Sequence, residues 1–273
     1  MKIAHIDPAQ FNSAMAPHDG AGALQYMTVL GNDDFGTNWM FIHAGVVPPG
    51  VSIGHHRHEC FEECYLIFDG AARFTHNGNT AELRGGVAVP LRLGESHGIY
   101  NHTDKDVPWL NIGVSSVKGE ADAEDLGEDL VDAVPGDPEL VPHQFLDRTL
   151  LEPNANAHGG VGEIYVNNLW KDEDFRTNLK FIAYVIVPPE CSIGYHHHET
   201  LEEVYLFLSG GGRMVVDDEV KEVTEGDCVL NRLGGSHGFY NPTHDPCELL
   251  VACVTQRKGI ADSTDLGDDL TTR

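Results

Sequence analysis

The sequence predicts an all-β protein built from two similar domains in tandem. Three observations carry this prediction. A unit of about 120 residues, an ordinary domain size, occurs twice; short apolar runs alternate with glycine and proline; and no long segment has the 3.6-residue period of an amphipathic helix. The 273 residues are enough for two domains that each bury a core of their own.

The duplication is visible in segments that recur 140 residues further along the chain. Agreement without a gap over such distances indicates an internal repeat. Three pairs show it best: SIGHHRHE at 52–59 with SIGYHHHE at 192–199, RLGESHG at 92–98 with RLGGSHG at 232–238, and DLGEDL at 125–130 with DLGDDL at 265–270.

Within each unit, apolar runs mark candidate strands; in the first unit they cover 41–47, 64–68, 71–76 and 109–117. Asn77-Gly78 lies between two such runs and is a strong signal for a two-residue hairpin turn. A stretch rich in proline and glycine begins at Val134 and is typical of a linker. We therefore predict an N-terminal domain over 1–134, a linker over 135–154 and a C-terminal domain over 155–273.

The charge of the chain limits its partners. There are 43 acidic and 17 basic side chains, which give a formal net charge of -26. Nucleic acids and anionic membranes are polyanions and would be repelled, so neither is expected as a partner. No stretch approaches the ~20 apolar residues that span a bilayer, and the first residues lack a signal-peptide pattern. The six cysteines form no CxxC pair, which favours a reducing compartment, and we expect a cytoplasmic protein.

Four side chains of the first unit point to a metal site: His56, His58, Glu63 and His97. Two histidines two positions apart leave the same face of a strand. Glu63 is an odd number of residues further on, so a turn or bulge before it must reset the register. Three imidazoles and a carboxylate suit Fe, Mn, Ni, Cu or Zn as divalent ions, and such ions keep positions open for substrate.

The second unit keeps all four residue types at the same spacing. One such histidine is weak as a signal, but a complete set in both units predicts up to two divalent transition metals per chain. The second set is His196, His198, Glu203 and His237.

These residues resemble the two motifs of the cupin family. The first motif is matched by Gly50, His56, His58, Glu63 and Gly70, and the second by Gly86, Gly94, His97 and Asn101, with equivalents in the later unit. The resemblance implies a bicupin: two tandem double-stranded β-helix (jelly-roll) barrels, each holding one metal through the four side chains. Two departures occur. Glu190 replaces a motif glycine, and Arg92 and Arg232 replace the usual proline.

Other residues are candidates for the chemistry beside the metals. Tyr65 and Tyr205 follow the glutamates by two positions and should face inward, as proton donors or as wall residues. Arg73 and Arg213 recur in a chain with few cations and would either clamp a substrate carboxylate or anchor an acidic side chain. The glutamates Glu63 and Glu203 are candidates for a catalytic role as well as for metal binding.

The strands that carry Glu63 and Glu203 are apolar on both faces, which is typical of strands buried on both sides. Their outward residues are Cys64, Leu66 and Phe68 in one unit and Val204, Leu206 and Leu208 in the other. We expect these faces to pack against the other domain or against a second copy of the chain, so a homo-oligomer is also considered.

Three functions fit the sequence. The first is a metal-dependent dioxygenase-type oxidoreductase that acts on a small polar substrate, possibly one with a carboxylate. The second is a redox-neutral isomerase, decarboxylase or lyase in which the metal polarises a carbonyl group. The third is a non-catalytic, metal-binding or ligand-sensing protein. Oxygen uptake, turnover without oxygen, and metal loading without turnover distinguish the three.

Overall fold

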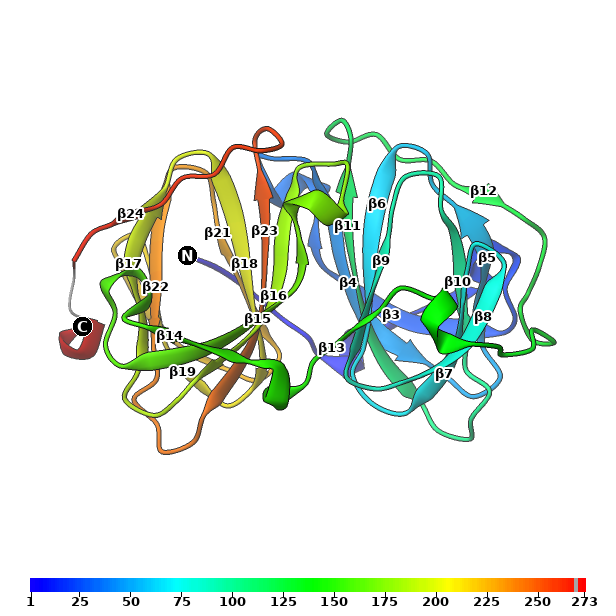
Figure 1. The fold of residues 1–273 in the computed structure, drawn as a ribbon, viewed down its shortest axis with the longest axis horizontal. Helices are drawn as coiled ribbons and strands as arrows, with labels where there is room; N and C mark the ends of the chain where they lie inside the picture. The colour runs from blue at the N-terminus through cyan, green and yellow to red at the C-terminus, as the bar shows by residue number, and fades with distance from the viewer. Residues whose placement is uncertain (268–269) are drawn as a thin grey trace.

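The computed structural model describes residues 1–267 and 270–273 and confirms the all-β fold of two jelly-roll barrels (Figure 1). Asp268 and Asp269 of the repeated tail lie outside the described residues. Each barrel consists of a seven-stranded and a five-stranded sheet. No helix in the described part of the chain is long and apolar enough to cross a membrane.

The two sheets of the first barrel have the orders β13-β9-β6-β11-β4-β3-β2 and β12-β5-β10-β7-β8. Their strands are β2 (Asn12–Met15), β3 (Ala23–Gly31), β4 (Trp39–Val47), β5 (Ser52–Arg57), β6 (Phe61–Ile67), β7 (Ala71–His76), β8 (Asn79–Arg84), β9 (Val87–Leu91), β10 (Ser96–Tyr100), β11 (Val107–Ser115), β12 (Glu124–Asp125) and β13 (Gln144–Phe145).

The second barrel repeats this arrangement with the orders β1-β21-β18-β23-β16-β15-β14 and β20-β19-β22-β17-β24. Its strands are β1 (Lys2–His5), β14 (Glu152–Ala155), β15 (Glu163–Lys171), β16 (Leu179–Val187), β17 (Ser192–His198), β18 (Leu201–Ser209), β19 (Gly211–Val216), β20 (Glu219–Thr224), β21 (Asp227–Asn231), β22 (Gly235–Tyr240), β23 (Cys247–Thr255) and β24 (Thr264–Asp265).

Short 3-10 helices lie between the strands. They are η1 (Pro8–Gln10), η2 (Pro17–Asp19), η3 (Asn32–Asp34), η4 (Pro138–Leu140), η5 (Arg148–Leu150), η6 (Ala157–Gly159), η7 (Asp172–Asp174) and η8 (Leu270–Thr272). The hairpin expected at Asn77-Gly78 joins β7 to β8, and both turn residues have positive φ angles of 48° and 77°. This conformation is the one that a two-residue hairpin turn requires at both positions.

Two strands cross between the barrels. Lys2–His5 pairs with β21 of the second barrel, and Gln144–Phe145 pairs with β9 of the first. The N terminus therefore lies against the second barrel (Figure 1). Lys2–His5 lies in the predicted N-terminal domain but pairs with the second barrel, and Gln144–Phe145 lies in the predicted linker. The division into 1–134, 135–154 and 155–273 stays a prediction.

The barrels share one hydrophobic core in addition to the core inside each. The shared cluster contains Cys64 and Leu66 from β6 and Val204 and Leu206 from β18, with Phe68 and Leu208 packed against it. The prediction that these outward faces are buried is confirmed, and the other barrel is what covers them. A homo-oligomer stays a prediction.

Two buried carboxylates clamp the barrels together at this interface. Glu202 accepts hydrogen bonds from the backbone N–H groups of Gly36 and Thr37, both at 2.8 Å, and from the Thr37 hydroxyl at 2.6 Å. Glu62 reciprocally accepts backbone N–H bonds from Arg176 and Thr177. Both glutamates are only 1% exposed. Each directly precedes a predicted metal ligand, so the interface also fixes the strands that carry Glu63 and Glu203.

Candidate metal centres

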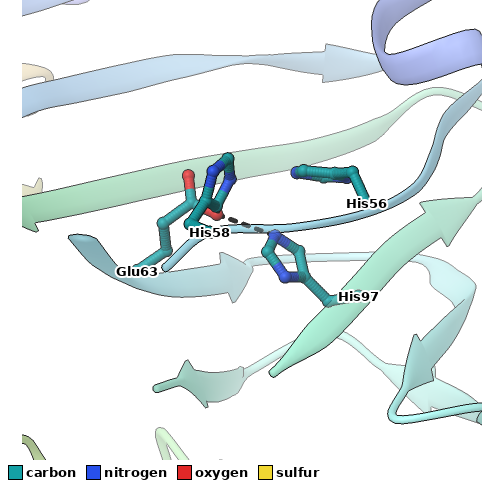
Figure 2. Close-up of side chains that lie close together, drawn as sticks. All are labelled: His56, His58, Glu63 and His97. Carbon is teal, nitrogen blue, oxygen red and sulfur yellow. Dashed lines mark ion pairs between the residues drawn. The ribbon is translucent and has the colours of Figure 1, made fainter. Parts of the chain in front are cut away.

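The four predicted ligands of the first barrel converge on one point inside it (Figure 2). His56 comes from β5, His58 from the turn after it, Glu63 from β6 and His97 from β10. Their ligand atoms all lie within 4.8 Å of one another, and all four residues are buried. Glu63 Oε2 is 2.7 Å from His97 Nε2 and 3.5 Å from His58 Nε2. The turn or bulge expected before Glu63 is present, because β5 ends at Arg57 and β6 begins at Phe61.

The second barrel builds the same group from His196, His198, Glu203 and His237, again with all ligand atoms within 4.8 Å and all residues buried. Glu203 Oε2 is 3.1 Å from His237 Nε2. Both sets predicted from the sequence are thus brought together by the fold.

Hydrogen bonds at Nδ1 orient the histidines toward the common point. His56 Nδ1 donates to the carbonyl oxygen of Gly54 at 2.8 Å, and His58 Nδ1 donates to that of Asp122 at 2.5 Å. His196 and His198 make the equivalent bonds to Gly194 and Asp262. A proton held at Nδ1 leaves the Nε2 lone pair free, which is the arrangement of metal-binding histidines.

The carbonyl of Asp122 belongs to the acidic tail that follows β11. The Asp122 carboxylate accepts hydrogen bonds from the backbone N–H groups of Glu59 and Cys60. Two residues later, β12 begins and pairs with β5. The tail is thus a strap that holds the ligand strand, and Asp262 with β24 repeats it in the second barrel.

The chemistry of the donors fits a divalent metal. Among the described residues, Glu63 Oε2, His97 Nε2 and His198 Nε2 are buried atoms that make no hydrogen bond, although the first two lie 2.7 Å apart. Buried polar atoms left unpaired cost free energy unless something binds them. Three imidazole nitrogens and a carboxylate oxygen face one point, so a metal ion bound there would be the partner of these atoms. The chain thus has the ligands for one divalent metal in each barrel, up to two per chain.

The protonation states of His56, His97 and Glu63 agree with ligand roles. For His58, burial alone would lower the pKa, but the Glu63 carboxylate outweighs it and raises that pKa. Burial, together with the nearby His97, lowers the pKa of His56 to about 2. Burial also lowers the pKa of His97, so both imidazoles are neutral at pH 7. Burial alone would raise the pKa of the Glu63 carboxyl, but the imidazoles of His58 and His97 outweigh it and hold that pKa well below its ordinary value. An ionised carboxylate and neutral imidazoles are the forms that bind metals.

A fourth histidine lies against each group and was not predicted as a site residue. The ring of His18 stacks on that of His56 with a centroid distance of 3.7 Å, and its Nδ1 is 2.7 Å from Asp125 of β12. His158 stacks on His196 in the same way. Both have positive φ angles of 53°, and strain of this kind is concentrated at functional sites. The recurrence of this histidine at an offset of 140 residues was a signal in the sequence.

The two barrels differ in how the metal-binding glutamate is held. Asn111 of β11 donates from Nδ2 to Glu63 Oε1 at 2.6 Å, so only Oε2 remains directed at the histidines. Val251 occupies the equivalent position on β23 and provides no such bond. The sequence reasoning missed Asn111, because it lies 48 residues from Glu63 and only strand pairing brings them together.

A cavity of about 430 Å³ opens beside the first group, and one of about 240 Å³ reaches Glu203 in the second barrel. His43 and Asn111 line the first cavity, whereas Ala183 and Val251 stand at the corresponding positions of the second. Burial lowers the pKa of His43 to about 4, so this side chain is neutral at pH 7. His43 was missed because its counterpart in the other unit is not a histidine.

Tyr65 and Tyr205 face the barrel interiors, as strand alternation predicted. The ring centroid of Tyr65 is 5.6 Å from that of His97, and Tyr205 is 5.0 Å from His237. Burial, with the charge of the neighbouring glutamate, raises the pKa of both hydroxyls well above its ordinary value. Both tyrosines therefore keep their protons at neutral pH.

The structure places Arg73 and Arg213, predicted as catalytic residues, away from the two cavities. Arg73 donates from Nη1 to the carbonyl oxygen of Ala133 and lies over the Tyr100 ring, and Arg213 pairs with Glu222. Neither belongs to the walls of the cavities that reach Glu63 and Glu203. The physical reason is strand alternation, because the buried neighbours Ala72 and Phe74 turn Arg73 toward the other face.

Arg92 also has a structural position. Its Nε donates to the carbonyl oxygen of Asp174 in η7 at 2.6 Å, across the interface between the barrels. Its guanidinium is also 3.7 Å from Glu95. Of the two readings given to Arg73 and Arg213, the anchoring of an acidic side chain fits Arg213, which pairs with Glu222.

Comparison with known proteins gives a consistent picture. A family model described as a cupin domain matches residues 45–113 and 183–253. An oxalate-binding protein of Thermotoga maritima is 31% identical over 102 residues, which are 37% of this chain and 83% of that protein.

Two solved structures resemble the whole chain. The oxalate decarboxylase of Lactobacillus farciminis, in a formate complex, has a TM-score of 0.65 at 15% identity over 97% of this chain and 89% of that one. A structure of the Bacillus subtilis oxalate decarboxylase, studied for its Mn(II) centres, has a TM-score of 0.63 at 16% identity over 96% of this chain and 79% of that one. At these identities the likeness shows a shared fold.

Proposed function

The chain belongs to the cupin family, and from that premise we propose that it is a divalent-metal-dependent enzyme that decarboxylates a small, metal-chelating carboxylate in its first barrel. The observation that carries the proposal is the convergence of His56, His58, Glu63 and His97 beside a cavity of about 430 Å³. A metal held there would supply Lewis acidity and open positions for substrate oxygens. The names of the similar proteins, an oxalate-binding protein and oxalate decarboxylases, support a carboxylate substrate.

The residues around the cavity suit a reaction in which a charged carboxylate leaves as neutral carbon dioxide. Among the described residues that line it, none is a lysine or an arginine, and most are apolar or aromatic. Such walls stabilise a substrate carboxylate poorly once water is excluded, whereas carbon dioxide carries no charge to desolvate. The first barrel therefore favours a reaction in which the substrate carboxylate leaves as carbon dioxide.

Roles follow for the polar side chains of this site. Asn111 holds Glu63 Oε1, which keeps the other oxygen available as a ligand. Tyr65 retains its proton and lies beside His97, so we assign it the protonation of the carbon that loses carbon dioxide. Glu203 and Tyr205 occupy the smaller second cavity, and we assign that barrel a metal-binding role that supports the fold.

The test is turnover without oxygen. The Mn(II)-loaded chain should release carbon dioxide from one or more members of a panel of oxo and hydroxy carboxylates under anaerobic conditions. His56→Ala should abolish release, and the matched variant His196→Ala should retain most of it. Mn(II) is the first metal to test because of the Mn(II) centres named for the B. subtilis enzyme. Absence of turnover with metal-loaded protein across the panel, with and without oxygen, would overturn the proposal.

A dioxygenase is the second candidate. The observation that favours it is a ligand set of three histidines and one glutamate, because metals such as Fe(II) can bind both a substrate and dioxygen at such a site. Oxygen consumption that matches substrate loss, in Fe(II)-loaded or Ni(II)-loaded protein, would select this candidate over decarboxylation. The six cysteines are free thiols, so we place either reaction in a reducing compartment such as the cytoplasm.

A further inference from the structure

The cavity beside Glu63 has flat aromatic walls that the corresponding cavity near Glu203 lacks. Tyr26, Phe41, Phe61 and Trp109 line the first cavity. The equivalent positions 140 residues later hold Val166, Phe181, Leu201 and Leu249. The first cavity has the larger volume, about 430 Å³ against about 240 Å³, although its side chains are larger. These side chains therefore border an open space instead of filling it.

The aromatic groups are arranged as surfaces against which a flat molecule can stack. Phe41 stacks on His43 with an interplanar angle of 4° and a centroid distance of 4.0 Å, and Tyr26 meets His43 edge-on at 5.2 Å. On the side of the ligands, Phe61 stacks on His58 at 3.8 Å. Aromatic rings prefer offset-stacked or edge-to-face contacts with one another. The walls thus match a planar, unsaturated body.

The charge of the cavity limits the ligand to few negative charges. Glu63 and Asp122 are the acidic side chains in its walls, and the part of its lining that the structure describes has histidines but no lysine or arginine to balance them. A bound divalent metal would be the main source of positive charge. A compact dianion such as oxalate would use only a fraction of the space.

We propose that the first barrel selects a ring-bearing monoanion whose carboxylate and adjacent oxygen chelate the metal, while the ring lies between the aromatic walls formed by Tyr26, Phe41, Phe61 and Trp109. The second barrel excludes this ligand, because its cavity is smaller and has lost most of these aromatic side chains. This inference names the substrate class of the site for which a function was proposed above. It depends on that proposed function only in requiring a metal at the site.

The test measures binding, which separates it from the test of turnover. The probe is 2-hydroxybenzoate, which has a ring, one carboxylate and a neighbouring oxygen, and oxalate is the reference that chelates without a ring. Calorimetric titration of the full chain loaded with Mn(II) should give one 2-hydroxybenzoate per chain, bound at least about tenfold more tightly than oxalate, since stacking contacts contribute of this order.

Variants copied from the second barrel identify the walls. Tyr26→Val and His43→Ala install the residues found at 166 and 183, which the same fold already tolerates. The double variant should bind 2-hydroxybenzoate about tenfold or more weakly than the wild type does. Its affinity for oxalate and its metal content should stay within twofold of the wild-type values. The matched control, Val220→Ala on the exposed β20, should change neither affinity.

The outcomes are distinct. Oxalate binding as tightly as 2-hydroxybenzoate, two ring ligands per chain, or variants without effect on the ring ligand would each overturn the inference. Selective binding of one ring ligand without any turnover of carboxylates would support the inference while the proposed decarboxylation fails. Decarboxylation of oxalate with no preference for ring-bearing ligands would support the proposed decarboxylation and overturn the inference.

Discussion

The imidazole of His58 donates a hydrogen bond from Nδ1 to the backbone carbonyl oxygen of Asp122, 2.5 Å away and 64 residues later in the chain. His198 and Asp262 repeat this contact at 2.6 Å and with the same separation. The contact fixes the tautomer of a candidate ligand, so the strap formed by the tail is part of each metal centre.

Asp122→Ala should therefore weaken metal binding in the first barrel by about 10- to 100-fold, as is typical when the groups that orient a ligand are lost. The change removes the carboxylate that accepts hydrogen bonds from Glu59 and Cys60, and with it the anchor of the strap. Competition with a chelator in the His196→Ala background measures the first site alone. An unchanged metal affinity would show that the strap does not position His58.

The carboxylate of Glu202 should make a large contribution to stability. It is buried and accepts three hydrogen bonds from Gly36 and Thr37 of the other barrel. Glu202→Ala leaves these donors unpaired and should lower the free energy of unfolding by about 3 kcal/mol or more. Urea denaturation measures the change, with Glu139→Ala on the exposed surface as the control within about 0.5 kcal/mol. A loss below 1 kcal/mol would contradict the clamp.

His43 should make the protein sensitive to acid. Its pKa is about 4 in the folded chain, below the ordinary value of 6.5, so between these values the unfolded chain holds a proton that the folded chain does not. Stability then rises with pH across this window and is lost as pH falls from 6.5 toward 4. Between pH 7 and pH 5 the loss is at most about 2 kcal/mol. His43→Ala should remove this part of the slope in denaturation curves at the two pH values; an identical slope would contradict the assignment.

Tyr65→Phe should lower kcat in the first barrel by about 100-fold or more if the hydroxyl donates the proton, since general acid catalysis contributes on that order. Metal content should remain unchanged, because Tyr65 is not one of the four converging ligands. Tyr205→Phe is the matched control and should leave kcat within about twofold. Steady-state kinetics with Mn(II)-loaded protein measure both; equal effects of the two changes would remove Tyr65 from the mechanism.

The metal ligands were predictable because a complete donor set recurs at one spacing in both units, and strand geometry explains how His56 and His58 share a face. The same alternation, applied to Ala72 and Phe74, would have turned Arg73 outward and prevented its assignment to the site. The burial of Cys64 and Val204 was also predictable, since a strand apolar on both faces needs a cover on both sides.

Other features depended on pairing between distant segments. The carbonyl of Asp122 carries no residue-specific signal, and Asn111 reaches Glu63 only because β11 pairs with β6. Lys2–His5 joins the second barrel through backbone hydrogen bonds to β21, which composition does not encode. His43 escaped a search for repeated residues because it is one of the differences between the units.

The central claim is that each barrel binds one divalent metal through three histidines and one glutamate. Metal analysis of the wild-type chain, His56→Ala, His196→Ala and the double variant tests it most directly, with circular dichroism to verify that each variant is folded. We predict two ions per chain in the wild type, one in each single variant and none in the double variant. Folded single variants that retain the metal content of the wild type would contradict the claim.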